Sequence, residues 1–253
     1  MNILKKIIDE KKKDVFLLKI KYKKIKKIKI KSNFIKNISE NNKKNKNSVI
    51  AEFKRYSPSV KKFKNTYEIE KIIKVYEDSK ATCISVLTDK NFGGTNQDIL
   101  KAKKYTKKPI IRKDFIIDKI QIYESALIGA EAILLIARIL SEQQLLNLEK
   151  YAHEIGLDVL IEIESQEDLN KIKKIKSKLI GINNRNLAKQ TININKTIEL
   201  SAKLKNKIIV SESGITRENI EIIKSHDISV FLIGGSILNS NNVKQYINDF
   251  CEK

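Results

Sequence analysis

Residues 50–59 read Ile-Ala-Glu-Phe-Lys-Arg-Tyr-Ser-Pro-Ser, an apolar lead-in that ends in charged and hydroxyl side chains. Alternate side chains of a β-strand point the same way, so Glu52 and Lys54 share one face. Opposite charges on the buried face of a strand are costly unless they pair or meet a ligand. The stretch therefore predicts a strand whose carboxyl end builds a site for a charged substrate.

Further short apolar runs follow this strand at intervals of roughly twenty to thirty residues, the length of one βα unit. The eight runs are residues 49–53, 83–87, 110–111, 132–136, 159–163, 179–182, 208–210 and 230–233. Their nearly continuous hydrophobicity is typical of parallel strands that are covered on both faces.

Helical patterns separate these runs. They cover residues 67–79, 95–105, 120–128, 141–155, 166–175, 193–204 and 217–224. Ser141 is the predicted N-cap of its helix, with Gln144 as the capping-box partner. The alternation predicts an α/β protein with a (β/α)8 TIM barrel of one domain, residues 1–253. A doubly wound open sheet is the alternative, but no G-x-G-x-x-G follows the first strand.

Residues 1–47 precede the first strand and are predicted to form an N-terminal helical extension. Ile3, Leu4, Ile7, Ile8, Val15 and Leu18 fit one helical face, which predicts an amphipathic helix over residues 2–19. Residues 20–30 leave helix and strand both open. Residues 41–47 are polar and are predicted to be a linker.

Net charge is +21, yet the cations do not favour a nucleic-acid partner. Of 51 basic residues 46 are lysine, spread over every segment, and aromatic residues are 6% and scattered. A nucleic-acid footprint would cluster its cations, favour arginine and interleave aromatics. We expect no dedicated nucleic-acid partner, although the charge alone keeps a basic RNA-binding protein as an alternative from another class.

Other classes are excluded more simply. No stretch approaches the roughly 18 apolar residues of a membrane span, so no membrane association is expected. Cys83 and Cys251 form no disulfide framework or redox pair by spacing, which favours a cytoplasmic protein. A monomer is the expected state.

Polar residues gather where the predicted strands end, and in a barrel these ends meet at one rim. In chain order the groups are Glu52, Lys54 and Ser57; Thr88 and Asp89 before Asn91–Gly94; Arg112, Lys113 and Asp114; Glu162 and Glu164; Asn183, Asn184 and Arg185; Ser211–Gly214; and Gly234–Ser236. One such group could be a structural ion pair. So many converging on one rim indicate chemistry.

Glycines add a second signal, because the chain has only eight. Gly214, Gly234 and Gly235 follow the last two strands, where barrels commonly bind phosphate through backbone N–H groups. Gly129 and Gly156 are expected to be helix C-caps.

Acid–base work falls to lysine and glutamate, because His153 and His226 lie away from the strand ends. No Cys, His and carboxylate grouping has the spacing of a metal site. Lys113 could form a Schiff base, as barrel aldolases do, or donate a proton. The residues alone leave both roles open.

Five ordered motifs carry a family resemblance. They are Ile-Ala-Glu-Phe-Lys-Arg-Tyr-Ser-Pro-Ser (50–59), Arg-Lys-Asp-Phe-Ile-Ile-Asp (112–118), Ile-Glu-Ile (161–163), Gly-Ile-Asn-Asn-Arg-Asn-Leu (181–187) and Ser-Glu-Ser-Gly-Ile (211–215). With them the chain resembles indole-3-glycerol phosphate synthase over nearly its whole length. The resemblance implies a carboxy-lyase of tryptophan biosynthesis. Such an enzyme converts 1-(2-carboxyphenylamino)-1-deoxyribulose 5-phosphate to indole-3-glycerol phosphate, carbon dioxide and water, without a metal or organic cofactor.

The resemblance also implies catalytic roles. Lys113 would be the general acid that protonates the ketone oxygen while the arene attacks its carbon. Lys54 would hold the anthranilate carboxylate, and Glu52 would keep Lys54 charged and oriented. Glu162 would be the general base and the proton shuttle of the dehydration. Asn183 would orient the carboxylates and the substrate.

Binding roles follow from the same resemblance. Arg185 would help to orient the substrate, and Glu212 and Ser213 would bind the ribulose hydroxyls. The phosphate would be held by Ser57, Gly214, Gly234 and Gly235. The aromatic pocket would be lined by Phe92, Leu134 and Leu187. One departure is Val60-Lys61-Lys62 after Ser-Pro-Ser, where the family usually has a glycine.

The nearest rival is phosphoribosylanthranilate isomerase, a phosphate-binding barrel of the same pathway. A cysteine after the first strand and an aspartate after the sixth would be expected of it. This chain has Glu52 and Lys54 in the first place and Asn183 in the second.

Overall fold

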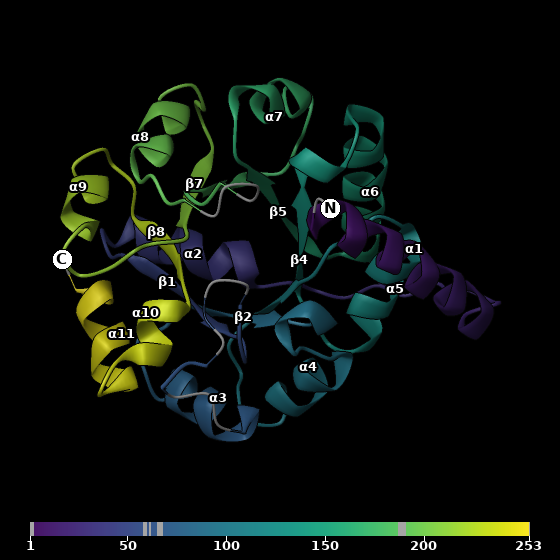
Figure 1. Cartoon of the computed structure of the whole chain (residues 1–253), viewed down its shortest axis with the longest axis horizontal. Coiled ribbons are helices and arrows are strands. Elements are labelled where there is room, and N and C mark those ends of the chain that lie inside the picture. Colours follow the sequence, from purple (N-terminus) through teal and green to yellow (C-terminus); the bar gives the residue numbers. More distant parts are fainter. Residues whose placement is uncertain (1–2, 58–59, 61, 65–67, 187–190, 253) are drawn as a thin grey trace.

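Eight short parallel strands follow one another around a closed barrel in chain order (Figure 1). The computed structural model describes residues 3–57, 60, 62–64, 68–186 and 191–252. The first strand pairs with the last, Ile50 opposite Leu232, which closes the sheet on itself. The predicted (β/α)8 TIM barrel is therefore confirmed, and the open-sheet alternative is wrong.

The strands keep the predicted order and positions. They are β1 (Ser48–Phe53), β2 (Cys83–Leu87), β3 (Ile110–Lys113), β4 (Ala132–Ile136), β5 (Asp158–Ile163), β6 (Leu179–Asn183), β7 (Ile208–Glu212) and β8 (Val230–Ile233). β3 and β7 each run two residues beyond their predicted ends. The apolar runs stop there, but the backbone ladder continues into the charged residues Lys113 and Glu212.

Helices surround this sheet, except that the one directly before β1 packs against the side chains inside the barrel (Figure 1). They are α1 (Ile3–Lys21), α2 (Phe34–Lys43), α3 (Ile69–Glu77), α4 (Asn96–Ala102), α5 (Lys119–Leu127), α6 (Glu142–Ile155), α7 (Gln166–Lys171), α8 (Asn195–Ser201), α9 (Ile220–Lys224), α10 (Gly235–Asn239) and α11 (Val243–Cys251), with 3-10 turns at Lys90–Phe92 and Ala137–Ile139. Among the described residues, no helix combines the length and the apolar character that a membrane span requires.

Each predicted helix has a counterpart at its place in the chain. The capping box of α6 is present, with the Ser141 N–H donating to Gln144 Oε1 at 2.9 Å and the Gln144 N–H donating to Ser141 Oγ at 3.2 Å. Several helices are shorter than predicted, because terminal turns of the patterns do not hold helical geometry. The predicted start at Tyr67 lies outside the described residues.

The N-terminal extension holds two helices rather than one helix and a linker. The helix predicted over residues 2–19 is α1, and residues 24–33 are neither helix nor strand. The predicted linker over residues 41–47 is wrong for its first part, because α2 continues to Lys43. Phe34 and Ile38 of α2 are fully buried among side chains inside the barrel, and that burial outweighs the weak helix propensity of the Asn-rich segment.

Side chains inside the barrel form layers contributed by alternate strands. One buried apolar layer comes from the odd-numbered strands and consists of Ile50, Ile111, Leu160 and Val210. Side chains two positions apart on a strand point the same way. The next layer toward the carboxyl ends of these strands therefore consists of Glu52, Lys113, Glu162 and Glu212. On each of these strands the last apolar residue that faces the inside of the barrel thus lies two residues before the charged one.

Gly156, the C-cap of α6, fixes how the N-terminal segment crosses that helix. Its φ of 95° lies in the left-handed region, and a Cβ there would collide with the carbonyl oxygen of Ile30. The Ile30 N–H donates to the Ile155 carbonyl at 2.8 Å, so the segment lies directly against the helix end. Gly129 has a similar φ of 91°, but a Cβ there would lie 3.2 Å from Cγ of the flexible Lys103 side chain.

Gly156→Ala should therefore destabilise the protein more than Gly129→Ala. Both variants place alanine in the left-handed region, which costs about 1–2 kcal/mol of stability. Only Gly156→Ala must also displace Ile30, so we expect an additional loss of at least about 1 kcal/mol in the free energy of unfolding. Urea unfolding followed by circular dichroism measures both values. Equal losses would show that the contact between Ile30 and α6 does not constrain position 156.

Candidate active site

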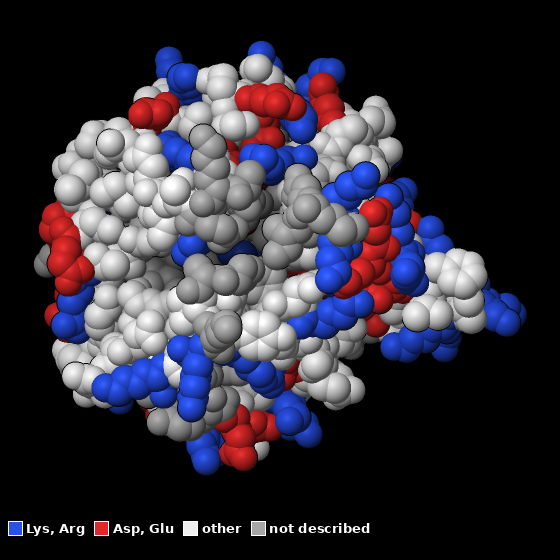
Figure 2. Space-filling model, in the orientation of Figure 1, with Lys and Arg blue, Asp and Glu red and all other residues white. Residues whose placement is uncertain are grey.

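A cavity of about 330 Å³ opens at the carboxyl ends of the strands. In Figure 2 the visible face is hollowed near its centre, and Lys or Arg atoms lie within the hollow. The volume is at the lower end of the range for small-molecule sites. This is the rim where the sequence predicted the functional residues.

Most of the predicted site residues line this cavity. They are Glu52, Lys54, Ser57, Phe92, Lys113, Leu134, Glu162, Asn183, Arg185, Ser213, Gly214, Gly234 and Gly235. Glu212 lies behind the lining and is fully buried. Leu187 and Lys61 lie outside the described residues.

Lys113, the end of β3, is surrounded by carboxylates from three other strands. Its Nζ lies 2.7 Å from Glu212 Oε2, 3.5 Å from Glu52 Oε2 and 3.9 Å from Glu162 Oε2. The Lys113 side chain is 16% exposed, whereas each of the three carboxylates is 5% exposed or less. The ammonium therefore reaches the cavity beside Glu52 and Glu162, which also line it, while Glu212 lies behind the lining.

The three carboxylates decide the protonation of this group. Burial opposes the charge of Lys113, but Glu212, Glu52 and Glu162 outweigh it and raise the pKa of the ammonium. Burial likewise opposes ionisation of Glu52, and there Lys54 and Lys113 prevail and lower the pKa of the carboxyl. Both groups are therefore held in their charged forms.

The pKa of Glu162 shifts in the opposite direction to that of Glu52. Burial and the neighbouring Glu212 carboxylate raise its pKa to about 8, although Lys113 and a hydrogen bond from Asn183 act against them. Asn183 Nδ2 donates to Glu162 Oε1 at 3.2 Å. Glu162 can therefore take up or release a proton near neutral pH.

Glu212 can lie beneath the lining because the neighbouring strand offers it space. Gly181 on β6 has no side chain, and a Cβ there would collide with Glu212 Oε1. The sequence prediction gave Glu212 a role in binding ribulose hydroxyls. Its placement against Lys113 gives it a direct electrostatic contact with the central ammonium.

Lys54 forms a second cationic group on the wall. Its Nζ lies 2.6 Å from Glu52 Oε1 and 5.7 Å from the centre of the Phe63 ring. The pairing predicted for Glu52 and Lys54 is confirmed. Glu52 thus contacts both lysines, one through each carboxylate oxygen.

An apolar sector of the wall follows β2, β3 and β4. The Phe92 and Phe115 rings are stacked with centroids 6.4 Å apart and planes at 27°, and Leu134 and Ile136 lie in the same lining. Phe115 was missed from the sequence, although it is the first apolar residue after the charged end of β3. Stacked rings beside aliphatic side chains suit a planar aromatic group.

A third sector follows β7 and β8. Ser213 and Gly214 have φ of 66° and 76°, so two consecutive residues adopt the left-handed conformation at the end of β7. A non-glycine residue rarely adopts this conformation. Gly234 and Gly235 lead into α10 in the same lining, together with Ser57. Backbone N–H groups in such loops can bind an anion.

Lys11 is a second residue in contact with the site that sequence reasoning did not single out. It comes from α1, outside the barrel, and its Nζ contacts Asp89 and Asp114, two residues of the lining. No signal in the run Lys11-Lys12-Lys13 distinguishes it from its neighbours. Among the described residues, no group of three or more His, Cys, Asp or Glu side chains is arranged to hold a metal ion.

Comparison with known families agrees with this geometry. A family model described as "Indole-3-glycerol phosphate synthase" matches residues 4–250. An indole-3-glycerol phosphate synthase of Legionella pneumophila (strain Lens) is 43% identical over 199 residues, covering 78% of this chain and 77% of the relative. One from Neisseria meningitidis serogroup C is 37% identical over 213 residues, covering 83% and 82%.

Solved structures with a similar backbone are distant in sequence. The 3-hexulose-6-phosphate synthase of Salmonella typhimurium superposes with a TM-score of 0.65 at 10% identity, covering 80% of this chain and 96% of that one. The thiamine phosphate pyrophosphorylase of Pyrococcus furiosus has a TM-score of 0.60 at 11% identity, covering 80% and 93%. At such identities the likeness shows the fold alone.

The raised pKa of Glu162 depends in part on the charge of Glu212. In Glu212→Gln that charge is absent, so we expect Glu162 to lose its proton about one pH unit lower than in the parent protein. Carboxyl ¹³C shifts of labelled glutamate, recorded from pH 4 to 10, measure the titration midpoint of Glu162 in the variant and in the parent protein.

Glu221→Gln is the matched control, because Glu221 lies on the exposed side of α9 with its side chain 71% exposed. This variant should leave the Glu162 midpoint near 8. A Glu162 midpoint that is the same in Glu212→Gln as in the parent would contradict the coupling.

Proposed function

The chain belongs to the indole-3-glycerol phosphate synthase family, and we propose that the cavity at its strand ends carries out the family's ring closure with the residues described above. The protein is a carboxy-lyase of tryptophan biosynthesis. It converts 1-(2-carboxyphenylamino)-1-deoxyribulose 5-phosphate to indole-3-glycerol phosphate, carbon dioxide and water. The small phosphorylated anilino-sugar is its substrate.

The observation that carries the proposed mechanism is the position of Lys113. Its ammonium faces the cavity, with the aromatic sector after β2–β4 on one side and the glycine sector after β7 and β8 on the other. In an eight-stranded barrel β3 and β7 lie across from each other. A substrate with an aromatic ring at one end and a phosphate at the other would then span the mouth, with its ketone above Lys113.

Ring closure begins in this arrangement with the arene carbon that bears the carboxylate. That carbon attacks the ketone carbon, and the ketone oxygen takes the proton of Lys113. The pKa of the ammonium is raised, which keeps the proton in place until an alkoxide more basic than the amine develops. The lysine therefore acts as an acid only at the reacting oxygen.

The same raised pKa argues against Schiff-base chemistry. A lysine that attacks a carbonyl must be a neutral amine, which enzymes obtain by lowering its pKa. Three carboxylates around Lys113 have the opposite effect. A barrel aldolase is therefore the weaker reading of this residue.

Decarboxylation follows, and the electron pair of the broken C–C bond restores the aromatic ring. Lys54 would hold the departing carboxylate, with Glu52 Oε1 at 2.6 Å orienting the ammonium. Arg185 would help to orient the substrate from the end of β6. Its N–H donates to Asn183 Oδ1 at 3.0 Å, which ties it to the residue that holds Glu162.

Dehydration completes the reaction, and it needs both a base and an acid. Glu162 would remove a proton from the ring-closed intermediate while the hydroxyl leaves as water with a proton from Lys54, since Lys113 has given up its proton in the ring closure. A pKa of about 8 suits this exchange, since the proton can be held and released at neutral pH. Ser213 would contact the hydroxyls of the sugar chain, and Ser57, Gly214, Gly234 and Gly235 would hold the phosphate. Glu212, fully buried behind the lining, would act through its contact with Lys113.

The remaining features are proposals of the same kind. We propose that the protein works as a monomer in the cytoplasm, without a metal or organic cofactor and without a dedicated nucleic-acid or membrane partner. Free thiols at Cys83 and Cys251, both buried, are compatible with a reducing compartment.

Lys113→Ala should lower kcat by at least about a hundredfold, the lower end of the effect of a general acid. Indole fluorescence during turnover of the anilino-ribulose phosphate measures the loss. Lys150→Ala is the control, because the Lys150 side chain is 79% exposed on α6 and should leave kcat unchanged. Near-parental kcat in Lys113→Ala would remove Lys113 from the acid role.

A further inference from the structure

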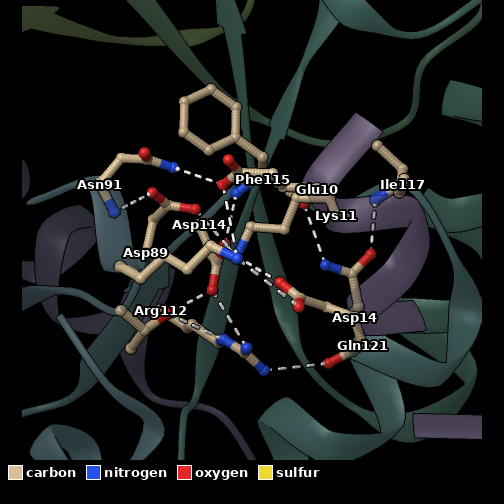
Figure 3. Close-up of polar contacts among 12 residues, drawn as sticks. Glu10, Lys11, Asp14, Asp89, Asn91, Arg112, Asp114, Phe115, Ile117 and Gln121 are labelled. Atoms are coloured by element: carbon tan, nitrogen blue, oxygen red, sulfur yellow. Dashed lines mark hydrogen bonds and ion pairs between the residues drawn. The ribbon is translucent and has the colours of Figure 1, made fainter. Parts of the chain in front are cut away.

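Lys11 carries a charge into a place where charges are costly. Among the described side chains of α1 it is the one charged group that is buried, with 6% of its surface exposed. Its Nζ lies 2.6 Å from Asp114 Oδ1 and 2.9 Å from Asp89 Oδ2, as Figure 3 shows. Moving a lysine and two carboxylates out of water is costly, and the exposed ion pairs elsewhere on α1 do not carry that cost.

Both partners of Lys11 hold the backbone of an aromatic residue of the cavity. Asp114 Oδ1, the atom that contacts Lys11, also accepts the N–H of Phe115 at 2.8 Å. Asp89 caps the 3-10 turn that ends in Phe92, with Oδ1 accepting from the Asn91 N–H at 2.8 Å and its carbonyl accepting from the Phe92 N–H at 3.0 Å. Lys11 therefore joins the two loops that present the stacked rings.

The inner side of the same network is already rigid. Arg112 Nη2 lies 3.1 Å from Asp114 Oδ2, and Gln121 Nε2 donates to the Phe115 carbonyl at 2.9 Å. Arg112 and Lys11 together overcome the effect of burial and lower the pKa of Asp114 to about 2. The barrel alone thus fixes Phe115 from one side, and α1 supplies the charge on the other side.

We propose that Lys11 is a positioning residue for the aromatic wall of the cavity. It holds the β2 and β3 loops together through Asp89 and Asp114, so that Phe92 and Phe115 stay stacked for the aminobenzoate ring of the substrate. The inference rests on the proposed function for the identity of that ring. It adds that the ring site is complete only when α1 is seated on the barrel.

Loss of Lys11 should affect the binding of the aromatic ring, but neither the chemical step nor the binding of the phosphate. Without Lys11 the two carboxylates face each other across the loops, and their charge also borders a cavity that receives an anionic substrate. Lys113 contacts Glu52, Glu162 and Glu212 on other strands, so its protonation does not depend on α1. The loop after β7 lies across the barrel from β3, and β1 separates the loop after β8 from the β2 loop. Loss of Lys11 should therefore raise KM far more than it lowers kcat.

Lys11→Met tests this, because it keeps the apolar stem and removes the charge. We expect KM for the anilino-ribulose phosphate to rise about tenfold, the scale of a modest loss of packing around a bound group, while kcat changes less than about threefold. Binding of 2-aminobenzoate, followed by its own fluorescence, should weaken in parallel. The inhibition constant of inorganic phosphate should stay within about twofold of the parental value. Uniform loosening of the site would instead weaken the binding of both ligands alike.

Lys12→Met is the matched control on the same helix. The Lys12 side chain is 66% exposed and pairs with Asp9 at 3.1 Å, so KM and kcat should both stay at parental values. A parental KM in folded Lys11→Met, or an equal loss of 2-aminobenzoate and phosphate binding, would overturn the proposal. Absence of turnover in the parent protein would instead contradict the proposed function, and the 2-aminobenzoate titration would still test Lys11.

Val15→Ala provides a second route that keeps every charge. Val15 is buried against Ile120 and Tyr123, so its truncation loosens α1 without touching the cavity. We expect a KM increase of about threefold. Val243→Ala on α11, a buried valine outside the cavity lining, should leave KM unchanged. Equal KM values in the two valine variants would overturn the link between α1 and the ring site, even if Lys11→Met did not fold.

Discussion

The ammonium of Lys113, held among three carboxylates, is the interaction on which the site depends. Lys113, Glu52, Glu162 and Glu212 come from the four odd-numbered strands and form the last layer inside the barrel. A barrel core is normally apolar at such positions. The charges are tolerated because Lys113 lies among the three carboxylates and Lys54 pairs with Glu52, so that these buried charges have partners of opposite sign. Fold and chemistry therefore meet at a single layer.

Much of this arrangement was accessible from the sequence, because the signal is local. Each odd strand has an apolar residue followed two positions later by a charged one, as in Ile50 and Glu52 or Leu160 and Glu162. Period-two alternation and the topology of a barrel then bring the charged residues together. Lys54, Asn183 and Gly234 were placed on the cavity by the same reasoning.

What escaped prediction depends on contacts between distant segments. The Asn-rich α2 is a weak helix in isolation, and it forms because Phe34 and Ile38 fill the inside of the barrel. Glu212 lies beneath the lining because Gly181, on another strand, leaves room for it. Lys11 differs from Lys12 and Lys13 only through Asp89 and Asp114, which no local pattern identifies.

The seating of α1 also has a consequence for how the protein is made. Translation proceeds at about 5–20 residues per second, so Lys11 leaves the ribosome roughly 5–20 s before Asp114, about a hundred residues later. Strand β1 waits longer still, because it pairs with β8 near the end of the chain. The first helix is thus synthesised early but can be docked only late. Until then Ile7, Lys11 and Val15, which the folded protein buries, stay exposed to solvent.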